Sequence, residues 1–108
     1  MPATTVVVVL TTLPADADAA AFGRTLVEAR LAACVGVVGE LRSIYRWNDA
    51  VQDALEQQLI IKTEAAAVEA LKACVAALHP YDVPEFLVLP ASDGGGAYLT
   101  WVRQSTTG

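Results

Sequence analysis

The chain has 108 residues, of which 55% are hydrophobic and 18% are charged, and its formal net charge is −5. A length of about 100 residues is typical of one domain, so we expect a single domain over residues 1–108. Intrinsic disorder is excluded because it requires low hydrophobicity. Nucleic-acid binding is not expected, because it depends on clustered Lys and Arg, which an acidic chain lacks.

The hydrophobic content is high for so short a chain. A domain of this size buries only about 60–70% of the surface that its unfolded chain exposes, so we expect another subunit to cover part of the apolar surface. A membrane helix needs about 20 consecutive apolar residues. The β-branched run at 6–10 ends at Thr11, and so we expect no membrane insertion.

We expect a cytoplasmic protein. Residues 1–5 contain no Lys or Arg, so they do not resemble a secretory signal peptide. Its two cysteines fit free thiols in a reducing compartment better than a disulfide.

The first elements are a strand and a helix. The continuous β-branched run at 6–10 is typical of a strand buried on both faces. Apolar residues then recur at helical spacing over residues 19–31, which predicts an amphipathic helix. Asp16 and Asp18 precede this helix, where negative charge is favoured.

A long hairpin follows. A second strand is predicted over residues 34–47, with a bulge or bend near Gly36 and Gly39. Asn48 and Asp49 predict the hairpin turn, because both residues tolerate the left-handed backbone conformation.

The chain then returns through a strand, a helix and a last strand. The return strand covers residues 51–61, and Thr63 is the expected N-cap of the second helix. That helix ends before Pro80, because proline disfavours helical backbone in the residue before it. The last strand covers residues 86–89, and a short C-terminal helix completes the chain.

The order of elements, β-α-β-β-α-β, is that of an α+β ferredoxin-like fold. In this fold an antiparallel sheet carries two helices on one face, because the crossovers are right-handed. The other face of the sheet and the extended hairpin are left uncovered by the helices. These are the surfaces that a partner is expected to bury.

Five segments, taken together and in order, resemble the CutA family of divalent-cation tolerance proteins. The segments are LAACV at 31–35, SIYRW at 43–47, IKT at 61–63, HPYDVPE at 79–85 and YLTW at 98–101. The resemblance covers most of the chain. It implies a cytosolic homotrimer of ferredoxin-like subunits, similar in architecture to the PII signalling proteins, with a role in tolerance of copper and other metals.

The hairpin departs from the family pattern in two ways. Asp49 stands where the family usually has a glycine, so the turn must place a side chain in strained or altered geometry. Gln52 and Ala54 stand in a segment that is often rich in glutamate, although Asp53 and Glu56 are kept. A metal-binding role of this segment is weakened accordingly.

The candidate metal ligands are Cys34, Cys74 and His79. Thiolate and imidazole ligands suit copper, so copper or another divalent cation is the candidate ligand. Strong metal sites have closely spaced ligands, whereas the two cysteines lie far apart in the sequence. The other interpretation is that both cysteines are small buried core residues.

A second candidate site is a ligand cleft formed by Lys62, His79, Tyr81 and Glu85. Lys62 precedes the second helix, where an anion would meet both a cation and free backbone amides. Glu85 could pair with His79 or with Lys62. The alternative is that these residues have a structural role between subunits.

The aromatic residues Tyr45, Trp47 and Trp101 are predicted anchors of the trimer interface, since aromatic side chains concentrate at subunit contacts. The chain has no nucleophile elbow, no P-loop and no His-Glu-x-x-His motif. We therefore expect no enzymatic activity and assign no catalytic residue.

Three functional interpretations stay open at this point. The first is a cytoplasmic homotrimer that acts in metal-ion response by weak binding of copper or another divalent cation. The second is a PII-like signalling or scaffold trimer that binds a small anion or a protein target at clefts between subunits. The third is a stable scaffold whose effect on metal tolerance is indirect.

Overall fold

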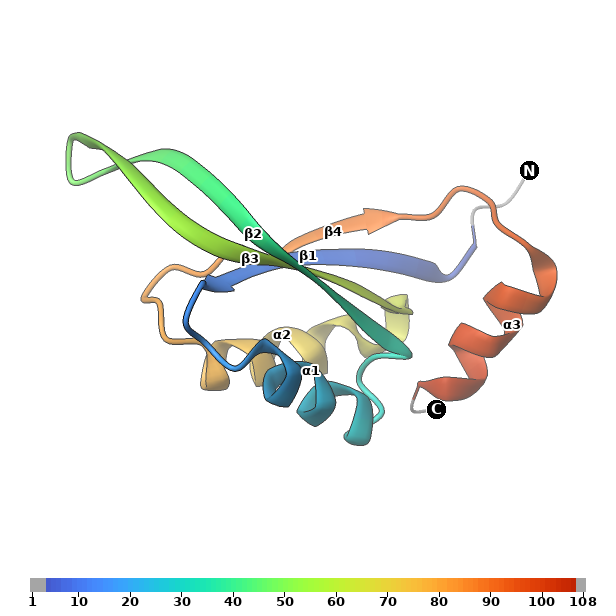
Figure 1. The fold of residues 1–108 in the computed structure, drawn as a ribbon. Helices are drawn as coiled ribbons and strands as arrows, with labels where there is room; N and C mark the ends of the chain where they lie inside the picture. The colour runs from blue at the N-terminus through green and yellow to red at the C-terminus, as the bar shows by residue number, and fades with distance from the viewer. Residues whose placement is uncertain (1–3, 107–108) are drawn as a thin grey trace.

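Four antiparallel strands form one sheet in the computed structural model, which describes residues 4–106. The strands are β1 (Val6–Pro14), β2 (Cys34–Trp47), β3 (Ala50–Glu64) and β4 (Leu87–Pro90). Their order across the sheet is β2-β3-β1-β4 (Figure 1). This order confirms the predicted α+β, ferredoxin-like fold.

Two helices cover one face of this sheet (Figure 1). They are α1 (Ala19–Glu28) and α2 (Val68–Leu78), the second preceded by a 3-10 turn at Ala65–Ala67. The predicted short C-terminal helix is α3 (Gly96–Ser105), which packs against the Val6 end of the sheet through Val102. No helix among residues 4–106 is long and apolar enough to cross a membrane.

The first helix begins where the acidic residues predict and ends earlier than its apolar spacing predicts. The carboxylate of Asp18 accepts a hydrogen bond from the backbone N–H of Ala21 at 3.0 Å. The predicted end at residue 31 is wrong, because Arg30 has a φ of 60° and reverses the chain. The backbone N–H of Leu31 then donates to the carbonyl of Leu26 at 3.0 Å, which satisfies the helix end.

The second helix begins later than predicted, and the assignment of Thr63 as its N-cap is wrong. Thr63 lies in β3, opposite Val7 of β1, and is fully buried. Its hydroxyl donates to the carbonyl of Leu31 at 2.7 Å. The hydroxyl therefore holds the chain that follows α1 against the sheet. It does not cap α2, which has no side-chain cap.

The hairpin between β2 and β3 has the predicted turn and the predicted bulge. Asn48 and Asp49 have φ values of 51° and 60°, the condition for a type I′ turn. The pairing of the strands shifts between Gly39 and Leu41, which leaves Glu40 as the extra residue of a bulge. Beyond this bulge the two strands continue together and extend away from the helices (Figure 1).

We expect Asp49→Gly to raise the free energy of unfolding by ~1 kcal/mol, because a non-glycine side chain is disfavoured in left-handed backbone. Urea unfolding at one fixed protein concentration measures this gain as a higher midpoint at an unchanged slope. Asp53→Gly, in the adjacent strand, is the control and is expected to destabilise the protein. A midpoint that falls in Asp49→Gly would contradict a strained turn.

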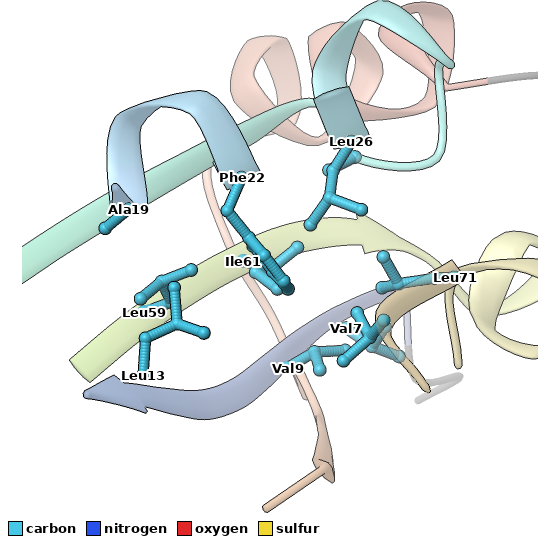
Figure 2. Close-up of a cluster of buried hydrophobic side chains, with 11 residues drawn as sticks. Val7, Val9, Leu13, Ala19, Phe22, Leu26, Leu59, Ile61 and Leu71 are labelled. Carbon is cyan, nitrogen blue, oxygen red and sulfur yellow. The ribbon is translucent and has the colours of Figure 1, made fainter. Parts of the chain in front are cut away.

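The core lies between the helices and one face of β1 and β3. Figure 2 shows side chains from α1 and α2 meeting alternate residues of both strands. The members that are completely or almost completely excluded from solvent are Val9, Leu13, Leu26, Ala32, Leu59, Ile61, Leu71 and Val75.

The opposite face of the sheet, here called the open face, carries large exposed apolar side chains. In the register of the strands, Val38, Leu87 and Leu89 lie on this face, and they are 52%, 57% and 46% exposed. On the hairpin, Ile44 and Val51 are each 67% exposed. The hydrophobic excess of the sequence is therefore concentrated on the open face and the hairpin.

Candidate functional site

A cleft of about 510 Å³ lies between the hairpin and the loop that follows α2. Its volume is within the range of about 300–1,000 Å³ that is usual for small-molecule sites. Alternate residues of β2 form one wall, and the loop over residues 80–85 forms the other. The lining side chains are Thr12, Ser43, Tyr45, Trp47, Glu56, Pro80, Tyr81, Asp82, Val83 and Glu85.

A hydrogen bond between Tyr81 and Glu56 joins the loop to the sheet. The Tyr81 hydroxyl donates to Oε2 of Glu56 at 2.7 Å. Glu56 is only 7% exposed, whereas Tyr81 is 36% exposed and faces the cleft. Burial raises the pKa of the Tyr81 phenol, and the hydrogen bond to Glu56 and the negative charge of its carboxylate raise it further.

We expect the protein to lose stability above about pH 10, in part through Tyr81. The pKa of Tyr81 is raised above its ordinary value of 10.0, so the folded chain holds the phenol proton more tightly than the unfolded chain. This contribution is complete below the unfolded pKa and is lost as pH rises toward the folded pKa. Urea unfolding at stepped alkaline pH should therefore show a shallower decline for Tyr81→Phe. An equal decline in both proteins would contradict the role of this phenol.

His79 holds the start of the same loop in place through hydrogen bonds on its buried side. It is buried, and its Nε2 lies 2.6 Å from the carbonyl oxygen of Thr12. Its Nδ1 accepts a hydrogen bond from the backbone N–H of Tyr81 at 3.1 Å. Because Nδ1 is an acceptor, Nε2 carries the proton and donates to Thr12. The imidazole thus ties the loop to β1 and places Tyr81 above Glu56.

Gln58 performs a similar role for Glu85. Its side-chain amide donates to the carbonyl of Thr11 at 2.7 Å and to Oε2 of Glu85 at 3.2 Å. One end of the loop is therefore held by His79 and the other by Gln58. The side chains of Tyr81 and Glu85 are therefore held in position by hydrogen bonds within the chain.

The structure brings together part of the ligand cleft expected from the sequence. Tyr81 and Glu85 line the cleft, and His79 lies directly behind Tyr81, with ring centroids 4.9 Å apart. Lys62 does not line it. Lys62 is six positions from Glu56 along β3, which corresponds to about 20 Å of extended strand.

The candidate metal ligands are placed in different parts of the molecule. Cys34 begins β2, and its sulfur lies 3.8 Å from the Tyr98 hydroxyl. Cys74 lies on α2 and packs against the main core. Both ring nitrogens of His79 are already hydrogen-bonded. Across residues 4–106, no group of three or more His, Cys, Asp or Glu side chains could hold a metal ion.

The three predicted interface aromatics are all exposed in the single chain. Tyr45 and Trp47 line the cleft from β2, with exposures of 44% and 47%. Trp101 lies on α3, is 44% exposed, and packs against Tyr98 with a centroid distance of 5.6 Å. Large exposed aromatic rings of this kind are available for contact with a partner.

Sequence reasoning did not include Glu56, Thr12 or Asp82 in the ligand cleft. Glu56 gave no distinct signal, because it stands between Leu55 and Gln57 in a strand that also carries Asp53, yet in the structure it is only 7% exposed. A carboxylate in such a position requires a local reason. The structure supplies one in the Tyr81 hydroxyl.

The comparisons with known proteins agree with this fold over nearly the whole chain. Residues 7–105 match the family described as CutA1 divalent ion tolerance protein. The chain belongs to this family. The CutA1 family was the one that the five sequence segments resembled, and that resemblance is confirmed.

Individual relatives match at substantial identity. The chain is 48% identical over 99 residues to a divalent-cation tolerance protein CutA from Thermus thermophilus, covering 92% of this chain and 96% of that protein. The solved structure of a Cut A1 protein from Thermus thermophilus superposes with a TM-score of 0.91 at 46% identity, covering 94% and 99% of the two chains. The CutA1 structure from Oryza sativa gives a TM-score of 0.92 at 37% identity, covering 97% and 96%.

Proposed function

We propose that this member of the divalent-cation tolerance family is a cytoplasmic homotrimer that binds copper or another divalent cation weakly. Membership of the family over residues 7–105 supports the role in metal tolerance. The observation that supports a homotrimer is the exposure of the apolar open face, where Leu87 is 57% exposed. A face of this kind, continuous with exposed hairpin aromatics, is suited to burial against further copies of the chain.

The donor groups that one chain offers support the proposal of weak binding. Structural metal sites ordinarily use four protein ligands, whereas residues 4–106 present no group of even three. An ion held by few ligands from each chain is bound loosely and exchanges readily. Cys34, Cys74 and His79 are the candidate ligands, and subunit contact could combine donors from different copies. The proposal includes no catalytic step.

The test is a calorimetric titration of copper and of zinc into the metal-free protein. We expect saturable binding by the wild type and at least a tenfold weaker affinity in Cys34→Ser and in Cys74→Ser, because each change removes a thiolate donor. Ser92→Ala, in an exposed loop, is the control for a small side-chain change and should bind as the wild type does. Unchanged affinity in both cysteine variants would exclude these thiols as ligands.

The alternative of a PII-like sensor of a small anion is not favoured by the charge of the cleft. Glu56, Asp82 and Glu85 all contribute carboxylates, and among the residues that the structure describes no Lys or Arg lines the cleft. Lys62, the cation expected there, lies elsewhere along β3. An anion in this cleft would therefore need cations from another copy.

A further inference from the structure

One end of the open face carries a positive charge. Lys62 of β3 lies opposite Val8 of β1 and Cys34 of β2, and Val8 lies opposite Leu89 of β4. Residues that lie opposite one another in a sheet share a face, so these four side chains form one row across the open face. Lys62 is partly buried in this row, and none of its three companions is a carboxylate. The row therefore presents a single ammonium group in apolar surroundings.

The other end of the same face is acidic. Gln58 is four positions before Lys62 on β3 and so lies on the same face. Its side-chain amide donates to Oε2 of Glu85 at 3.2 Å, which holds Glu85 against the open face. Glu85 lines the cleft together with Glu56 and Asp82, and no Lys or Arg does so in the part of the chain that the structure describes. The open face is therefore positive at one end and negative at the other.

Apolar side chains separate the two ends. Leu10 of β1 lies opposite Leu87 of β4 and Ile60 of β3, in the row between Lys62 and Gln58. A surface with this pattern is complementary in charge to a second copy of itself when the two copies meet head to tail. In such a contact two different patches meet, and the arrangement closes into a ring when the rotation between copies allows it. Three copies in a ring are the proposed trimer.

The two charges cannot meet within one chain. Lys62 and Glu56 are six positions apart on β3, about 20 Å of extended strand. The ion pairs found among residues 4–106 involve neither Lys62 nor Glu85. Glu64, the acidic residue two positions after Lys62, accepts a hydrogen bond from the hydroxyl of Thr5 at 3.0 Å. When other copies cover the open face, the ammonium group of Lys62 loses water and needs a carboxylate from outside its own chain.

We propose that Lys62 of one copy pairs with Glu85 of the next, and that the partner copy thereby contributes a cation to the cleft. This inference rests on the proposed homotrimer and names the contact that sets its head-to-tail order. Gln58 holds Glu85 in position within the chain, so the pair forms with little reorganisation. The residues that the sequence groups into one ligand cleft, Lys62, His79, Tyr81 and Glu85, then meet between two chains and not within one.

The test is a charge exchange, followed by sedimentation over a dilution series. The quantity measured is the protein concentration at which half of the trimer is dissociated. Lys62→Glu and Glu85→Lys should each raise it at least tenfold, because each brings two like charges together. The double variant restores the pair in the opposite sense and should return it to within about threefold of the wild type. Lys72→Glu, an exposed change on α2 on the helical side, is the control and should assemble as the wild type does.

Neutral variants provide a second measurement that does not depend on how charge-reversed chains fold. Lys62→Gln and Glu85→Gln should each raise the same concentration severalfold, and their combination should raise it no further than either one alone. Additive effects of the neutral changes, no effect of any single change, or no rescue by the charge exchange would overturn the ion pair. Each of these results leaves a trimeric wild type in place. A wild type that is monomeric at micromolar concentration would refute the homotrimer and the ion pair together.

Discussion

Light scattering is expected to give about three times the chain mass of 11.3 kDa. Trp47→Ala is expected to weaken the trimer by ~2 kcal/mol or more. Trp47 lies near the tip of the hairpin and is 47% exposed in the single chain. A large aromatic anchor that becomes buried between subunits is the typical hot spot of an interface. A loss of ~2 kcal/mol in the free energy of association corresponds to a dissociation constant roughly 30-fold higher. Sedimentation over a dilution series measures it.

Leu78→Ala is the matched control for this experiment. Leu78 is 46% exposed, close to the value for Trp47, but it lies on α2, on the helical side of the sheet. If the open face and the hairpin form the interface, truncating Leu78 leaves the assembly unchanged. A wild type that is monomeric at micromolar concentration would refute the interpretation of the hydrophobic excess. Equal effects of both substitutions would place the interface elsewhere.

Periodicity in the sequence was sufficient to predict the elements and their order, but not where the helices begin and end. The apolar spacing that marks α1 continues to Leu31, and yet the helix ends at Glu28 because Arg30 adopts a left-handed conformation. Thr63 has the side chain of a helix cap, but its hydroxyl is used by the carbonyl of Leu31. Both outcomes depend on a contact between segments that are far apart in the sequence, which local patterns do not contain.

The composition of the cleft depends on the bulge at Glu40. Before it, Val38 lies opposite Gln58, so even-numbered residues of β2 lie on the open face. After it, Leu41 lies opposite Glu56, so odd-numbered residues continue that face. One extra residue thus turns Tyr45 to the same side as Glu56. The sequence predicts a bulge in this region but not its position, and therefore it predicts aromatic anchors without assigning them to the cleft.

The core on the helical side of the sheet is expected to stabilise each subunit independently of assembly. Leu26→Ala is expected to lower the free energy of unfolding by ~3 kcal/mol, because it leaves a cavity between α1 and the sheet. Leu26 is completely buried and lies among Phe22, Ile61 and Leu71 in the core (Figure 2). Urea unfolding measures the loss. Both proteins must be compared at one concentration, since dissociation of an oligomer contributes to its apparent stability.

Val27→Ala tests whether this loss comes from the core. Val27 is the next residue on the same helix, but it is 39% exposed and is not a member of the cluster around Leu26. Its truncation is expected to change the free energy of unfolding by less than ~0.5 kcal/mol. Equal losses in the two variants would mean that α1 contributes through exposed contacts as much as through its buried face. A large difference would instead place the stability of the subunit on its helical side, leaving the open face and the hairpin free to serve assembly and binding.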